Sequence, residues 1–160
     1  MAEHFYNVKR VALIISHTDD ESALGQTVRK IRHWTNSDIL SPVGDKSTGT
    51  GVSRMYDEDA VYIAALLLEV TRYGVTVVML ETFEEWIKEC WEDTDEWAEA
   101  KAGRRELVFQ MGWQDDGSGF YTPITEDKRL FWKPLGGSDR EAYGSSIVVN
   151  ATNVFKRLNW

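Results

Sequence analysis

Residues 25–56 constrain the fold most, because they join a short basic segment, a proline and a glycine-rich loop in that order. Thr27 is a good N-cap, since its hydroxyl can accept an N–H of a first helical turn. Pro42 limits how far such a helix can run. Three apolar residues spaced by three then share one face: Val28, Ile31 and Trp34. The pattern predicts a short helix over residues 27–36.

The other sides of this predicted helix are basic. They carry Arg29, Lys30, Arg32 and His33. A short helix with an apolar back and a basic front suits the DNA major groove, where Arg and Lys reach guanine edges or phosphates. The alternative is an ordinary solvated helix face, because charge clusters often have no other role.

A glycine-rich loop follows over residues 44–53, with three glycines and no large apolar side chain. Its composition predicts the tip of a β-hairpin. Lys46 lies inside the loop, and Arg54 and Tyr56 follow it. Backbone N–H groups, hydroxyls, Arg and Lys are common phosphate ligands. A plain surface loop is the alternative.

These motifs, in this order, resemble the winged helix-turn-helix of the MerR family of bacterial transcription regulators. The match covers about residues 24–87. It rests on a glycine turn, a Thr-Val-Arg-Lys-Ile-Arg-His-Trp segment, a proline, a glycine-rich wing with Arg-Met-Tyr, an acidic helix start and a Tyr-Gly pair: Gly25, 27–34, Ile39-Leu40, Pro42, Gly51, 54–56, 57–59 and 73–74. The sequence departs from the family at Thr35, where glutamate is usual, and at His33, where an aromatic residue is usual.

The resemblance implies a dimeric DNA-binding protein whose basic helix enters the major groove and whose wing contacts phosphates. Its DNA-binding residues would be Thr27, Arg29, Lys30, Arg32, His33, Lys46, Arg54 and Tyr56. RNA polymerase is a further partner implied by the family. The first helix of this unit is expected over 18–24, although that segment is acidic. Val11–Ile15 fits either a strand or the start of a buried helix.

The net charge of −8 is unevenly distributed. Residues 26–56 carry five basic and two acidic side chains, whereas residues 81–103 carry nine acidic and two basic ones. A local basic patch matters more than the total, because salt screens charges beyond about 8 Å. The total still predicts weak non-specific DNA binding.

Two helices are expected after the wing. The first is strongly apolar, begins at Asp57 and stops at Gly74. The second is acidic, runs over 77–103 and carries one sustained stripe. By resemblance this stripe pairs with its copy in a dimer through Phe83, Ile87, Cys90, Trp91 and Ala98. The alternative is that it packs on the protein's own C-terminal region.

The last part of the chain changes character. Residues 107–113, 119–124, 130–135 and 146–158 are short runs rich in β-branched and aromatic residues, separated by turn signals. They predict a small antiparallel sheet, closing on a final helix or strand over 150–158. Aromatic residues here could line a pocket for a planar effector, or could simply be core.

The sequence thus predicts an α+β chain with three parts: a winged helix-turn-helix over 1–76, a long dimerisation helix over 77–103 and a β-rich region over 104–160. No metal-ligand spacing, phosphate loop or nucleophile elbow is visible in the sequence, so neither a cofactor nor an enzyme is expected. One cysteine and no membrane-length apolar run favour a cytoplasmic, nucleoid-associated protein. The expected function is sequence-specific binding to an inverted repeat in double-stranded DNA as a homodimer. The alternative is a protein-interaction module that uses the Trp-rich acidic helix.

Overall fold

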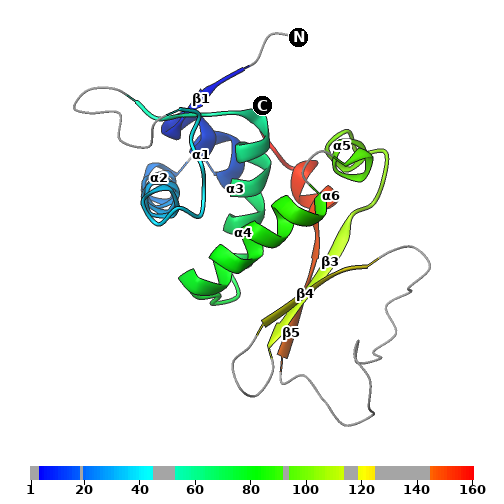
Figure 1. The fold of residues 1–160 in the computed structure, drawn as a ribbon. Helices are drawn as coiled ribbons and strands as arrows, with labels where there is room; N and C mark the ends of the chain where they lie inside the picture. The colour runs from blue at the N-terminus through cyan, green and yellow to red at the C-terminus, as the bar shows by residue number, and fades with distance from the viewer. Residues whose placement is uncertain (1–3, 19, 45–52, 92–93, 114–118, 125–144) are drawn as a thin grey trace, which may run out of the picture.

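The computed structural model describes residues 4–18, 20–44, 53–91, 94–113, 119–124 and 145–160. One helix, α3 (Glu58–Thr71), lies at the centre. Figure 1 shows helices α1 and α2 on one side of it, and the helices and sheet of the second half of the chain on the other. The combination of helices with small antiparallel sheets, expected of an α+β chain, is confirmed.

The first helix is α1 (Val8–Ser16), which places Val11–Ile15 in a helix and not in a strand. Asn7 caps it, because its side chain accepts a hydrogen bond from the Arg10 N–H at 3.0 Å. Four of its residues are buried. The helix ends at His17, whose φ of 51° turns the chain toward the next helix.

Helix α2 (Glu21–Asn36) begins six residues before the predicted start. The expectation of one helix over 18–24, a turn at Gly25 and a second helix from Thr27 was therefore wrong. Asp20 is the N-cap, and its carboxylate accepts from the Ala23 N–H at 2.8 Å. A carboxylate there is favoured by both the cap hydrogen bond and the helix dipole. Gly25 sits inside the helix.

A short two-stranded sheet links the two ends of this N-terminal unit. Strand β1 (Tyr6–Asn7) pairs antiparallel with β2 (Met55–Tyr56), and Val43 forms a further bridge to Met55. Residues 45–52 between the bridge and β2 lie outside the described residues. The predicted hairpin tip, with Lys46, falls within them.

Helix α3 follows the sequence prediction closely. Asp57 caps it through the Ala60 N–H at 2.8 Å, and Gly74 lies just beyond its end with a φ of 76°. Ten of its fourteen residues are buried, so it has almost no solvent face. It contacts α1, α4 and α6.

The single long helix predicted over 77–103 is two helices. Helix α4 (Val77–Trp91) ends, and α5 (Asp95–Lys101) starts afresh with Thr94 as its N-cap. The Thr94 hydroxyl accepts from the Trp97 N–H at 3.2 Å. The apolar stripe predicted over 77–103 is therefore interrupted at Thr94, because a capping threonine marks the start of a new helix.

The C-terminal sheet has the order β4-β3-β5, with both pairings antiparallel. Its strands are β3 (Val108–Trp113), β4 (Gly119–Ile124) and β5 (Ser145–Asn150), followed by α6 (Ala151–Phe155). The predicted antiparallel sheet and its closing helix are confirmed. The predicted run over 130–135 lies outside the described residues.

One hydrophobic core includes residues from all six described helices and from β2, β3 and β5. Tyr62 of α3 packs edge-on against Phe155 at 4.7 Å between ring centroids, and Trp97 of α5 packs against the same Phe155 at 5.1 Å. The Asn159 N–H also donates to the Ile14 carbonyl of α1 at 3.1 Å. The two ends of the described chain are thus tied into the same core.

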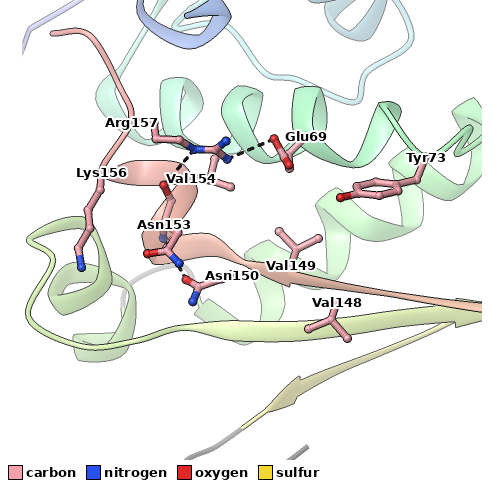
Figure 2. Close-up of a pocket in the computed structure, with 9 residues that line it drawn as sticks. All are labelled: Glu69, Tyr73, Val148, Val149, Asn150, Asn153, Val154, Lys156 and Arg157. Atoms are coloured by element: carbon pink, nitrogen blue, oxygen red, sulfur yellow. Dashed lines mark hydrogen bonds and ion pairs between the residues drawn. The ribbon is translucent and has the colours of Figure 1, made fainter.

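A groove of about 480 Å³ opens between α3, β5 and α6 (Figure 2). Within the part of the chain that is described, no helix is long and apolar enough to cross a membrane.

Candidate nucleic-acid interface

Helix α2 divides into a buried and an exposed face. Its buried side chains are Thr27, Ile31, Trp34 and Thr35. Its exposed side includes a straight stripe with steps of four, three, four and three residues, formed by Ser22, Gln26, Arg29, His33 and Asn36. Side chains with this spacing stand one above the other along a helix. Each of the five can take part in hydrogen bonds. We call this row the α2 stripe.

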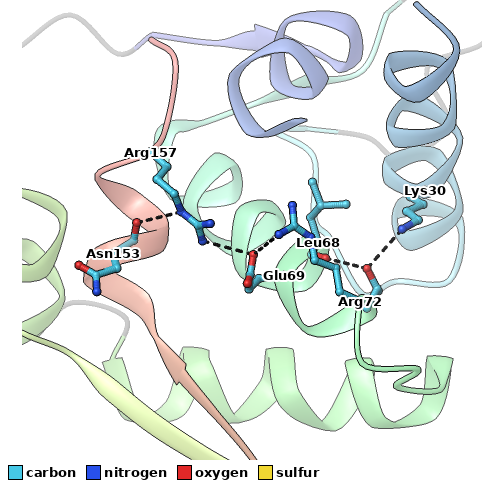
Figure 3. Close-up of polar contacts among 7 residues, drawn as sticks. Lys30, Leu68, Glu69, Arg72, Asn153 and Arg157 are labelled. Carbon is cyan, nitrogen blue, oxygen red and sulfur yellow. Dashed lines mark hydrogen bonds and ion pairs between the residues drawn. The ribbon is translucent and has the colours of Figure 1, made fainter. Parts of the chain in front are cut away.

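Two further cations lie on either side of the α2 stripe. Lys30 and Arg32 are both exposed, and they precede His33 by three residues and one residue. The Lys30 ammonium donates to the Thr71 hydroxyl at the end of α3, at 3.4 Å (Figure 3). The only acidic residue of α2 is Glu21 in its first turn. The exposed face beyond that turn is therefore free of carboxylates.

Four of the predicted DNA contacts are thus brought together on one surface: Arg29, Lys30, Arg32 and His33. Arg54, partly exposed, lies immediately before β2. Lys46 falls outside the described residues, so its position is not given.

Thr27 and Tyr56 are not at the surface, which corrects their expected role as DNA-binding residues. Thr27 is only 6% exposed, and its hydroxyl donates to the Ala23 carbonyl at 3.1 Å. Tyr56 is fully buried, and its hydroxyl lies 2.8 Å from that of Thr35. Both side chains hold α2 in place and are closed to a DNA backbone.

A second group of charges lies beside α2, around the last turn of α3. Glu69 accepts from Arg72 at 3.1 Å and from Arg157 at 3.3 Å, so one carboxylate serves two guanidinium groups (Figure 3). Partial desolvation, followed by the charges of Arg157 and Arg72, lowers the pKa of His17 below its ordinary value. The lowered pKa thus reflects burial first and the two nearby guanidinium groups second.

Two of the five residues of the predicted dimerisation stripe, Phe83 and Ile87, are buried within the protomer. Phe83 is fully buried, and its ring lies 5.0 Å from that of Phe109 in β3. Ile87 is 1% exposed. Their burial within the protomer contradicts their assignment to a dimer interface. For Phe83, the contact with Phe109 agrees with the alternative of packing on the C-terminal region. Ala98 is exposed, and the side chains of Cys90 and Trp91 lie outside what is described.

Sequence reasoning missed three members of the α2 stripe: Ser22, Gln26 and Asn36. The first two were lost because the helix was started at Thr27. An Asp N-cap followed by glutamate, here Asp20-Glu21, is a recognised start signal and would have extended the helix backward.

Within the described residues, no three His, Cys, Asp or Glu side chains gather into a possible metal site. No protein-family model matches the chain, and no curated protein is significantly similar to it in sequence.

Proposed function

We propose that the protein is a MerR-type, sequence-specific DNA-binding regulator, whose helix α2 enters the major groove. The single observation that carries this proposal is the α2 stripe: five exposed hydrogen-bonding side chains, flanked by Lys30 and Arg32, with no carboxylate after the first turn. Arg, Gln, Asn and Ser are the side chains that hydrogen-bond to base edges and phosphates.

The order of elements supports a winged helix-turn-helix. Helices α1 and α2 follow each other closely in the chain, and Val43 bridges Met55 of the strand β2 that comes after them. In such a unit the second helix reads the groove mainly through its N-terminal half. Gln26 and Arg29 would then face bases, and Arg54 would contact a phosphate from the wing.

The overall charge of −8 opposes binding to the DNA backbone. Nine acidic residues fall within residues 81–103, which include most of α4 and all of α5, whereas α2 carries only Glu21. Salt screens charges beyond about 8 Å, so the local charge around the α2 stripe matters more than the total. We therefore expect modest affinity for random DNA and a strong preference for a specific site.

The test is selection from a random-sequence duplex pool at about 100 mM salt, where phosphate contacts still contribute. Enrichment of an inverted repeat would support a dimeric reader and give its half-site spacing. Gln26→Ala and Arg29→Ala should each lower affinity for the selected site by about 5- to 150-fold and relax the preference at one base pair.

Arg104→Ala is the matched control. Arg104 follows α5, and its side chain is 65% exposed. The substitution removes the same charge as Arg29→Ala, but at a position outside α2. It should leave the preferred sequence unchanged. If the folded protein enriches no sequence, the proposal fails.

The rival function is protein interaction through the tryptophans of the acidic helices. Trp97 is only 4% exposed, and Trp86 is half-buried with its ring 5.8 Å from that of Phe109. These two tryptophans are core residues, which weakens the observation that favoured the rival.

A further inference from the structure

The groove between α3, β5 and α6 is bounded on one side by the edge of a β-sheet. Its lining includes Val148, Val149 and Asn150 of β5 and Glu69 and Tyr73 of α3. Figure 2 shows Tyr73 of α3 on the same side of β5 as Val149, with Val148 on the other side of the strand. Strand β5 is an edge strand of the three-stranded sheet among the described residues.

The register shows which backbone groups of β5 point outward. Ala151 lies opposite Leu107, and its N–H donates to the Leu107 carbonyl at 2.8 Å. Hydrogen-bonded and non-hydrogen-bonded pairs alternate along an antiparallel ladder. Val149, opposite Phe109, is therefore bonded to β3, whereas the N–H and C=O of Val148 point away from β3. Val148 thus offers one donor and one acceptor toward the groove.

The side chains around this edge are apolar and accessible. Tyr73 is 57% exposed and Val148 is 43% exposed, whereas Val149, on the opposite face of the sheet from Val148, and Val154 are each 4% exposed. Exposed apolar side chains next to a strand edge that pairs with no other strand among the described residues are the features that an added strand uses.

The polar end of the groove is positively charged. Arg157 and Lys156 line it, and Glu69 is the lining carboxylate. Glu69 is already shared between Arg157 and Arg72. Among the described residues, Lys156 has no ion-pair partner. An anionic ligand would therefore find a cation whose charge is not already neutralised.

We propose that this groove binds an extended, acidic segment of a partner protein, which pairs as an additional strand with the edge of β5. The backbone of the segment would hydrogen-bond to Val148. Its apolar side chains would pack on Tyr73, on the Val149 face of the strand, and its carboxylates would lie at Lys156 and Arg157. A second copy of the chain fits less well, because β5 itself, with the sequence SSIVVN, supplies no carboxylate. This binding site is separate from the α2 stripe and does not depend on DNA binding.

The experiment uses the full chain and two fluorescent peptides of equal length, one of alternating valine and glutamate and the other of alternating valine and lysine. The glutamate peptide should bind at least about fivefold more tightly, as expected for one charge-assisted contact. Val148→Pro removes the outward N–H but spares the ladder to β3, since proline is tolerated at a strand edge. It should weaken the glutamate peptide by about fivefold, the effect of one lost hydrogen bond.

Val148→Thr is the matched control, because it keeps the N–H and the β-branched shape, and it should bind nearly as the wild type. Lys156→Glu should abolish the preference for glutamate, whereas Lys9→Glu, at an exposed position on α1, should preserve it. If Val148→Pro fails to fold, amide exchange of Val148 in the wild type gives the same information: the glutamate peptide should slow it.

Equal binding of the two peptides, or unchanged exchange at Val148, would overturn the proposal. So would sedimentation showing that the wild type is a dimer and that Val148→Pro is a monomer, because the edge would then hold a second copy. None of these outcomes bears on the DNA selection, so the two proposals can fail separately.

Discussion

The hydroxyl of Tyr56 lies 2.8 Å from the hydroxyl of Thr35, and both side chains are fully buried. Thr35 also donates to the Ile31 carbonyl at 2.9 Å, so the remaining proton, that of Tyr56, completes the pair. The contact joins strand β2 to the last turn of α2. It fixes the exposed face of α2 relative to β2.

Tyr56→Phe should therefore lower the free energy of unfolding by about 0.5–1.5 kcal/mol, the usual value of one hydrogen bond. Urea unfolding measures this effect. The salt dependence of DNA binding should not change, because the hydroxyl does not reach a phosphate. Tyr73→Phe, at a residue 57% exposed, should leave stability unchanged. A flatter salt slope in Tyr56→Phe would restore the phosphate role.

Arg54→Ala should weaken binding to all DNA sequences about equally. If Arg54 contacts one phosphate, the slope of log affinity against log salt should fall in magnitude by about 0.9. Fluorescence anisotropy at several salt concentrations gives this slope. Arg104→Ala should leave it unchanged. An unaltered slope in Arg54→Ala would remove this residue from the interface.

Phe83→Ala tests whether the acidic helix contributes to the core or to a dimer interface. Phe83 is fully buried against Phe109, so its truncation should cost about 3–5 kcal/mol of stability. The loss should be the same at low and high protein concentration. Val78→Ala, at a position of the same helix that is 69% exposed, should cost almost nothing. A loss that disappears at high concentration would point back to dimerisation.

Asp59 ties α3 to α5, since one oxygen accepts from Trp97 at 2.9 Å and from Lys101 at 2.6 Å. Burial alone would raise the pKa of this carboxyl, but the hydrogen bonds from Lys101 and Trp97 hold the pKa below its ordinary value. The resulting stabilisation is present above the unfolded pKa of about 3.9 and is lost as the pH falls through the lower folded pKa. Asp59→Asn should reduce this acid-dependent loss, as measured by thermal unfolding between about pH 5 and 2. Equal pH dependence in both proteins would contradict the assignment.

The lowered pKa of His17 predicts a second change in stability, at a pH closer to neutral. Partial desolvation, Arg157 and Arg72 all disfavour its protonated form. The unfolded chain therefore takes up the proton first, and stability should fall as the pH drops through about 6.5. His17→Asn should flatten this dependence, because asparagine does not titrate. Asparagine also tolerates the φ of 51°, so the backbone at this position should be kept. Arg72→Gln should also reduce it. A wild-type slope in both variants would exclude His17 as its source.

The sequence predicted those elements whose local signals agree with their packing. Asp57, the apolar run after it and Gly74 together specify α3, because the cap, the buried face and the left-handed stop point to the same helix. The hairpin signals after residue 104 likewise led to β3, β4 and β5.

The errors arose where two residues fit one role or one residue fits two roles. Asp20 and Thr27 can each cap a helix, and Asp20 does so, with Glu21 in the first turn and the helix packed on α1. Thr94 fits either a helical stripe or a cap. Tyr56 has an apolar ring and a polar tip, so its type alone does not reveal whether it is buried or exposed.

The near-complete burial of α3 has a consequence for how the protein opens. Helices α1, α4 and α6 all cover α3, so the detachment of any one of them exposes apolar side chains of α3 to water. Amide hydrogens of α3 should then exchange with solvent only through global unfolding, more slowly than those of α2 or β5. Helix α2 and the edge strand β5 would thus open locally while α3 stays folded.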